Sequence, residues 1–326
     1  MSKSRLLAAL LAGALLAISG CGTTEDASTG EPSADTASGE TITIVDARGK
    51  EVVLDGPATR VAGSEWNVVE NVVSLGVMPV GVADIEGYQT WVSSAPLDDT
   101  VTDIGTRGEP SIDTLVALEP DVLLVTDSLV DGAIEQIEET IPVIVVPGGD
   151  ATDNIGQMFE TIDLIATVTG TEDAAAELKA SFEAKVEEGR AAVEAAGATG
   201  DAVAFSDSYV DAGSVSIRPY ADGSLISEVF AEIGLENAWS MEGDPAYGLA
   251  QTDIEGLTAL DDAHFWYMAN DAFGDPYADE LADNAIWMDL PFVTGDKVVR
   301  FPDSIWTFGG PTSMEQIIDA AVDALS

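Results

Sequence analysis

Arginine and aromatic side chains in predicted loops are the residues whose types and positions could support chemistry. The 326-residue sequence contains only 12 lysines and arginines, so an arginine flanked by glycine, such as Arg107, is not ordinary surface composition. A guanidinium offers five N–H donors in a planar fork, and aromatic rings offer broad apolar faces. Such groups favour the binding of a bulky ligand with exposed oxygen atoms. The candidate ligand-binding residues are Trp66, Tyr88, Trp91, Arg107, Arg218, Tyr220, Trp306 and Phe308.

Catalytic chemistry has little support in the sequence. His264 is the only histidine, and its position within the apolar run 263–268 is typical of a core or strand-edge histidine. No serine–histidine or cysteine–histidine pair can be assembled with it as the catalytic base, and no glycine motif that cradles phosphate precedes a helix. No histidine cluster is available for zinc or manganese. We therefore predict no catalytic residue, no metal site and no intrinsic cofactor.

The predicted elements place the candidate residues at one edge of a sheet. Apolar runs alternate with amphipathic stretches, a pattern typical of α/β domains with mostly parallel sheets. Loops that follow the carboxyl ends of parallel strands line the ligand crevice, so the candidate side chains should meet in one cleft. Strands are predicted at 77–82, 122–125, 143–146, 203–205, 265–268 and 298–301.

An internal repeat predicts two similar lobes. Residues 112–122 and 254–264 share a pattern of short helix, turn and buried strand, and residues 74–77 resemble 232–235. Thr252 and Glu255 have the spacing of a capping box at the start of the second copy of the longer pattern.

One long helix is predicted between the lobes, from Thr171 as N-cap to a stop at Gly197. Leu178, Phe182 and Val186 recur every four residues, and no proline interrupts the segment. A helix of this length would span roughly 40 Å and would restrict hinge motion. The predicted organisation is an N-terminal lobe at 41–170, a linking helix at 171–197 and a C-terminal lobe at 198–326.

The first forty residues predict export and membrane attachment. Lys3 and Arg5 precede an apolar stretch at 6–18, which is shorter than the roughly 20 residues of a membrane-spanning helix. We interpret 1–20 as a signal peptide. The residues before Cys21, the only cysteine, resemble a bacterial lipoprotein cleavage box, which implies acylation of Cys21 and anchoring at the outer face of the cytoplasmic membrane. Residues 21–40 lack large apolar side chains and are predicted to form a flexible tether.

The chain is strongly acidic, with 59 aspartates and glutamates and a net charge of −47. Loss of the signal peptide, with Lys3 and Arg5, leaves 10 basic residues and a net charge of −49. This field disfavours nucleic acid and polyanionic ligands and favours neutral or cationic ones. A general adaptation of the surface to salt or solubility is the alternative explanation.

Several segments together resemble the ferric hydroxamate-binding proteins of bacterial siderophore importers. In the first lobe the similarity lies in 60–66, 75–84 and 104–110, and in the second lobe it lies in 223–228, 234–239 and 286–298. The resemblance covers about residues 41–325. It implies a class III periplasmic binding protein, with two Rossmann-like lobes and a shallow cleft, that delivers an iron-loaded chelate to the permease and ATPase of an ABC transporter.

The resemblance also implies roles for particular residues. Arg107 corresponds to the arginine that hydrogen-bonds hydroxamate oxygens, and Tyr247 replaces a tryptophan of the family's site. Glu135 corresponds to a glutamate that docks on the permease. The siderophore completes the iron coordination, so the protein, expected as a monomer, should supply no metal ligand. Thr126 and Val130 stand where the family's hydroxamate binder has aromatic contacts, so the particular siderophore is not specified.

Charge favours a hydroxamate siderophore over a catecholate. A ferric tris-catecholate carries about three negative charges, whereas a ferric tris-hydroxamate is neutral or, with a free amine, cationic. Two candidate arginines are too few for the former. The alternatives are a vitamin B12 or haem binder of the same fold and, from other classes, a lipid-anchored hydrolase or a structural surface protein.

Overall fold

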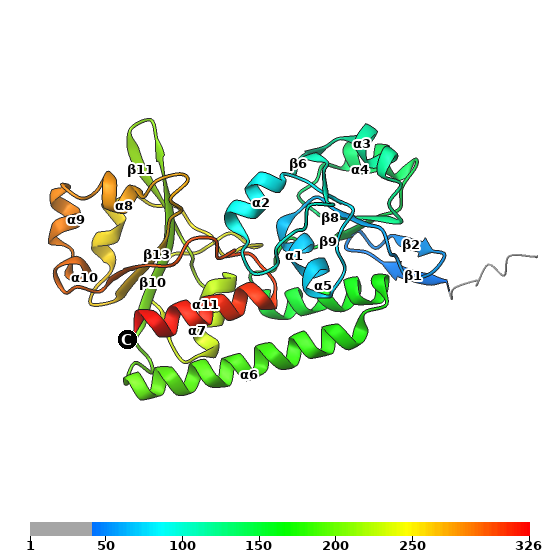
Figure 1. Cartoon of the computed structure of the whole chain (residues 1–326). Helices are drawn as coiled ribbons and strands as arrows, with labels where there is room; N and C mark the ends of the chain where they lie inside the picture. The colour runs from blue at the N-terminus through cyan, green and yellow to red at the C-terminus, as the bar shows by residue number, and fades with distance from the viewer. Residues whose placement is uncertain (1–40) are drawn as a thin grey trace, which may run out of the picture. The chain divides into compact units, whose positions relative to one another are not determined.

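The computed structural model describes residues 41–326 (Figure 1). Its first lobe is built on a five-stranded sheet of order β5-β4-β3-β8-β9. All neighbouring strands in this sheet are parallel. Both faces of the sheet are covered, because consecutive residues of one strand, such as Leu123 and Leu124, belong to different buried clusters. The strands are β3 (Val61–Gly63), β4 (Gly81–Val82), β5 (Thr102–Asp103), β8 (Val122–Thr126) and β9 (Val143–Val146).

Helices and two small hairpins surround the first sheet. The hairpins pair β1 with β2 and β6 with β7, and both are antiparallel. The remaining elements of this lobe are β1 (Ile42–Val45), β2 (Glu51–Leu54), β6 (Gly105–Thr106), β7 (Glu109–Pro110), α1 (Trp66–Ser74), α2 (Ile85–Trp91), α3 (Ile112–Leu118), α4 (Asp131–Glu138) and α5 (Asn154–Thr169).

The second lobe has a mixed five-stranded sheet of order β11-β10-β13-β14, with β12 paired to β10. Only the β10–β11 pair is antiparallel. Its core is rich in aromatic residues, and the rings of Phe265 and Phe292 stack at 4.8 Å. The elements are β10 (Ala202–Asp211), β11 (Ser214–Pro219), β12 (Glu236–Asn237), β13 (His264–Met268), β14 (Val298–Arg300), α7 (Leu225–Glu232), η1 (Gly256–Ala259), α8 (Pro276–Asp279), α9 (Ala285–Asp289), α10 (Pro291–Thr294) and α11 (Pro311–Ala324).

The α/β class and the two lobes are confirmed, and two predicted strands are corrected. The predicted strand 77–82 is reduced to β4, because Val77 closes the end of α1 through a hydrogen bond to Val72 and Pro79 has no N–H to donate. The predicted strand 203–205 is the start of the longer β10, which turns back into β11. Ala212 and Gly213 both have positive φ at this turn, as a tight two-residue hairpin requires.

The internal repeat corresponds to a repeated structure with different capping. Residues 112–122 form α3 and lead into β8, and residues 254–264 form η1 and lead into β13. The predicted capping box is wrong. The Asp253 carboxylate accepts hydrogen bonds from the backbone N–H groups of Glu255 and Gly256, while the backbone of Thr252 pairs with Ile217.

Helix α6 (Glu172–Ala196) occupies the predicted linking segment and ends at Gly197, whose φ is 75°. It packs against α5 and α11, so it touches elements of both lobes (Figure 1). Thr171 holds the N-cap position, but its hydroxyl bonds to Thr169 and makes no capping bond to the helix. Within residues 41–326, no helix is both long and apolar enough to cross a membrane. The predicted signal peptide, Cys21 and the tether lie outside the described residues.

Gly189 allows α6 to approach its neighbours closely. A Cβ at this position would lie 2.6 Å from Ile318 of α11 and 2.8 Å from Ile233 at the end of α7. Gly189→Ala should destabilise the fold by about 1 to 2 kcal/mol, because overpacking outweighs the roughly 1 kcal/mol gain in helix propensity. Gly132→Ala in α4, where a Cβ meets open space, is the matched control and should be neutral or stabilising. Chemical denaturation would contradict this account if both variants gained stability.

Candidate ligand-binding cleft

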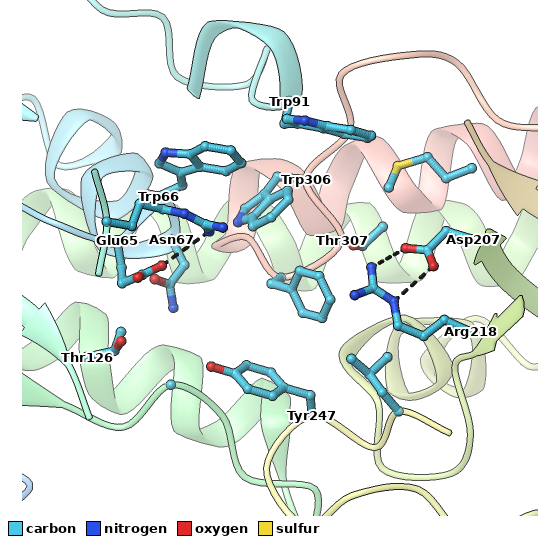
Figure 2. Close-up of a pocket in the computed structure, with 15 residues that line it drawn as sticks. Glu65, Trp66, Asn67, Trp91, Thr126, Asp207, Arg218, Tyr247, Trp306 and Thr307 are labelled. Carbon is cyan, nitrogen blue, oxygen red and sulfur yellow. Dashed lines mark hydrogen bonds and ion pairs between the residues drawn. The ribbon is translucent and has the colours of Figure 1, made fainter. Parts of the chain in front are cut away.

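A cavity of about 460 Å³ lies between the lobes, at the carboxyl ends of both sheets (Figure 2). Thr126 and Met268, the last residues of β8 and β13, both line it, as expected for a parallel α/β crevice. We call it the interlobe cavity. Its lining residues are Glu65, Trp66, Asn67, Trp91, Arg107, Thr126 and Gly148 from the first lobe, and Asp207, Arg218, Tyr247, Leu249, Met268, Trp306, Thr307 and Phe308 from the second.

Arg107 lies over an indole ring on the first-lobe wall. Its guanidinium carbon is 4.1 Å from the ring centroid of Trp66, a cation–π geometry. Its Nη1 donates to the carboxylate of Glu65 at 3.3 Å, and 37% of its side chain remains exposed. Trp66 is held in turn, because it is 95% buried and its Nε1 donates to the carbonyl of Ala83. The guanidinium is therefore oriented but accessible to a ligand in the cavity.

A continuous series of aromatic rings connects the two lobes. Trp66 packs edge-on against Trp306 at 5.0 Å, and Trp306 packs against Phe308 at 5.2 Å. Phe308 in turn meets Tyr247 at 5.5 Å. Figure 2 shows the rings of Trp66, Trp91 and Trp306 around the same space. These surfaces can desolvate a bulky ligand without requiring a particular pattern of hydrogen bonds.

Arg218 forms the cationic group of the second lobe. It lies opposite Asp207 in the β10–β11 register, and Nε donates to the Asp207 carboxylate at 2.9 Å while Nη2 makes a second, shorter bond (Figure 2). Burial alone would lower the pKa of Arg218, but Tyr220 and Asp207 raise it above its ordinary value. The hydroxyl of Tyr220 also reaches Asp207, at 3.1 Å, and Thr307, at 2.9 Å. Arg218 is thus a fixed, paired cation.

Two further groups of the cavity have pKa values that burial displaces. Burial raises the pKa of Glu65, and the nearby Arg107 and Ser128 only partly offset this effect. Burial also raises the pKa of Tyr247, and the negative charges of Asp127 and Glu65 add to it. At neutral pH the Tyr247 hydroxyl is therefore protonated and can donate a hydrogen bond.

The structure brings most of the predicted residues together. Tyr88 and Tyr220 are the exceptions, because both are at least 99% buried and neither lines the cavity. Tyr88 instead donates its hydroxyl to the carbonyl of Ala95, and Tyr220 supports the wall through Asp207. The predicted residues that line the cavity are Trp66, Trp91, Arg107, Arg218, Tyr247, Trp306 and Phe308.

Glu65 and Asp207 are cavity residues that the sequence did not reveal. Glu65 could have been found from its position after a strand and directly before Trp66. Asp207 could have been found if the hairpin had been predicted, because the hairpin register places it opposite Arg218. Among 59 acidic residues, neither stood out.

The remaining predicted residues lie elsewhere. Glu135 is exposed on α4. His264 begins β13, with its Nε2 3.4 Å from Asp201, which agrees with a strand-edge histidine. Within residues 41–326, no group of three or more histidine, cysteine, aspartate and glutamate side chains is arranged to hold a metal ion.

Two α/β lobes, a long helix packed on both and a ring-lined cavity at the strand ends define a solute-binding protein of class III architecture. The chain belongs to the periplasmic binding protein family, whose model matches residues 61–305.

Several proteins that are similar to this chain have names that state an iron-containing ligand. The chain is 25% identical to the iron(3+)-hydroxamate-binding protein FhuD of Escherichia coli (strain K12), over 82% of this chain and 86% of that protein. It is 26% identical to the Fe(3+)-citrate-binding protein YfmC of Bacillus subtilis (strain 168), over 93% and 90%. A solved structure of FhuD from Vibrio cholerae, bound to Fe3+-Desferal, superposes with a TM-score of 0.73 at 26% identity, covering 82% of this chain and 97% of that one.

Proposed function

We propose that this protein is the extracytoplasmic solute-binding component of an ABC importer, and that it captures a ferric siderophore of the hydroxamate type in the interlobe cavity. The observation that carries the proposal is the accessible guanidinium of Arg107, held against Trp66 within a ring-lined cavity. A charged N–H donor can bind the oxygen atoms of a hydroxamate, and the rings can cover the apolar chain between them. The FhuD relatives, whose names specify iron–hydroxamate or Fe3+-Desferal, support the same ligand class.

The charges that line the cavity support a ligand without net negative charge. Arg107 is paired with Glu65 and Arg218 with Asp207, so the two cations face two carboxylates. A ferric tris-catecholate would bring about three negative charges into this balanced site and into the field of a chain with a net charge of −47. A neutral ferric hydroxamate avoids that desolvation and repulsion.

The ligand, in this proposal, is a complete iron chelate. The siderophore supplies all of the atoms bound to iron, and the protein supplies rings and hydrogen-bond donors around it. The protein carries out no bond-breaking step and functions as a binding protein without an intrinsic cofactor. Within residues 41–326 no three histidine, cysteine, aspartate or glutamate side chains are arranged to hold a metal ion, which suits recognition of a preformed complex rather than of free ferric ion.

Delivery requires attachment to the membrane and contact with the transporter. Acylation of Cys21 would hold the protein at the outer face of the cytoplasmic membrane, and the tether would let it reach the permease. The exposed Glu135 on α4 is the proposed docking group of the first lobe.

Tryptophan fluorescence titration tests the ligand class directly, because Trp66, Trp91 and Trp306 all line the cavity. Ferrioxamine or ferrichrome should quench the emission with saturable binding. Ferric enterobactin, a tris-catecholate, and ferric citrate should bind far more weakly. Saturable binding of ferric catecholate or ferric citrate, without binding of either hydroxamate, would overturn the hydroxamate assignment.

A further inference from the structure

Glu65 is a carboxylate on the cavity wall whose hydrogen-bonding capacity is largely unused. A carboxylate can accept about four hydrogen bonds. Within residues 41–326, Glu65 accepts two long ones, from Arg107 Nη1 at 3.3 Å and from Ser128 Oγ at 3.5 Å. Its side chain is 19% exposed, and Figure 2 shows it among the residues that line the cavity. Because both contacts are long, most of the acceptor capacity of the Glu65 carboxylate remains available to a ligand.

The second carboxylate of the cavity is in a different state. Asp207 accepts two hydrogen bonds from Arg218 and a third from the Tyr220 hydroxyl, at 3.1 Å. Its charge is therefore compensated before a ligand arrives. The two walls are not equivalent, and the group available to a ligand cation is Glu65.

Arg107 and Glu65 can serve one ligand at the same time. The single described hydrogen bond of Arg107 uses one Nη1 donor, so most of its five N–H groups remain for ligand oxygens. A ligand that takes those donors draws the guanidinium towards its own oxygens and weakens the 3.3 Å contact to Glu65. Glu65 then needs another donor, because a half-buried carboxylate without one is costly.

We propose that Glu65 is a specificity-determining residue that receives a cationic group of the ligand, so that the preferred ferric hydroxamate bears a free ammonium. The inference rests on the proposed function and extends it to one subclass of hydroxamates. The neutral iron centre lies against Arg107, and the ammonium, with three donors, lies against Glu65. An anionic substituent in the same position would be repelled.

The decisive comparison uses two ligands that differ in one charge. Ferrioxamine B carries a terminal ammonium, and its N-acetylated derivative has the same iron centre without the charge. The wild-type protein should bind ferrioxamine B about tenfold more tightly, the effect of one charge-assisted contact. Glu65→Gln should bind both ligands equally, mainly through weaker binding of ferrioxamine B.

Glu109→Gln is the control variant that distinguishes a direct contact of the ligand with Glu65 from the general negative field of the protein. Glu109 is exposed two residues after Arg107 and does not line the cavity, so this variant removes the same charge nearby without touching the site. It should keep the wild-type preference, as measured by isothermal titration calorimetry. Thermal melting of both variants checks that each is folded.

Three outcomes would overturn the inference. Equal affinity of the wild-type protein for the two ligands would show that no carboxylate of the protein binds the ammonium group. A parallel loss of affinity for both ligands in Glu65→Gln, with the preference kept, would show that Glu65 only orients Arg107. Failure of the wild-type protein to bind either ligand would overturn the inference, and failure to bind ferrichrome as well would refute the proposed function.

Discussion

Arg107→Ala should weaken binding of a ferric hydroxamate by about 1.5 to 3 kcal/mol, or roughly 10- to 150-fold in Kd. The guanidinium is the only first-lobe cation that lines the cavity among the described residues, and its position against Trp66 orients it before the ligand arrives. Its loss leaves ligand oxygens desolvated without a charged donor. Fluorescence titration with ferrioxamine would measure the change.

Two further variants distinguish the fork of donors from the charge alone. Arg107→Lys keeps the cation but loses the planar fork and the ring stacking, so its affinity should lie between those of the wild type and Arg107→Ala. Arg60→Ala removes an exposed arginine that bonds to the carbonyls of Leu118 and Glu119, outside the cavity, and should leave ligand affinity unchanged. Wild-type affinity in Arg107→Ala would remove this residue from the binding site.

Glu70→Ala should lower the free energy of unfolding by about 2 to 4 kcal/mol. Glu70 is fully buried on α1 in the first lobe, yet its Oε1 accepts from the Thr312 hydroxyl at 2.8 Å and from the Ser313 N–H at 3.0 Å, at the start of α11 in the second lobe. The Glu70 carboxyl group thus caps the N-terminus of α11 by accepting a hydrogen bond from its first turn, because the N-cap residue Gly310 has no side chain to do so. Urea denaturation would measure the loss.

The pH dependence of Glu70 provides a second, independent test. Burial raises its pKa, and the bonds from Thr312 and Ser313 offset this only in part. The folded state therefore holds the Glu70 proton to higher pH than the unfolded state, whose pKa is about 4.3. Between the unfolded-state and folded-state pKa values the folded state binds more protons than the unfolded state. The contribution of Glu70 to stability therefore falls as pH rises through this range, and it levels off above the folded-state pKa.

Glu70→Gln isolates this effect from the other acidic residues. The amide of this variant would keep an oxygen acceptor for the Ser313 N–H but would not titrate, so the stability of the wild type relative to the variant should fall as pH rises from about 4.3. A difference independent of pH, or a stable Glu70→Ala variant, would contradict the assigned role.

A second carboxylate, on the second lobe, forms hydrogen bonds to a helix of the first lobe. Glu228 of α7 accepts hydrogen bonds from the backbone N–H groups of Asn154 and Ile155, at 3.0 and 2.8 Å, and so caps the start of α5. Each lobe therefore caps a helix of the other. Together with α6, this arrangement favours small adjustments of the cleft over wide hinge opening.

The sequence predicted those elements whose local pattern matches their final environment. Strands β8 and β9 are apolar throughout and are buried on both faces, so Val122–Val125 and Val143–Val146 could be placed directly. The segment before β4 is also apolar, but Pro79 and the end of α1 prevent pairing there. The β10–β11 hairpin was missed, because the polar half of β10 gives no hydrophobic signal, and only the turn at Gly213 marks it.

The site was predictable in outline, because scarce arginines and aromatics followed predicted strands. The predicted loop after β4 is wrong for Tyr88 and Trp91, because both lie on helix α2. Tertiary packing decides which side chain of this helix faces the cavity, so Trp91 lines it and Tyr88 is buried. The carboxylate partners were hidden by the abundance of acidic residues. Glu65 and Asp207 become meaningful only when their distances to Arg107 and Arg218 are known.

A crystal structure of the protein with bound ferrioxamine B would test the central claim most directly. The ligand should lie between Trp66, Trp91 and Trp306, with the guanidinium of Arg107 on its hydroxamate oxygens and every atom bound to iron belonging to the siderophore. A protein side chain in the iron coordination sphere, or a ligand bound away from the interlobe cavity, would contradict the account.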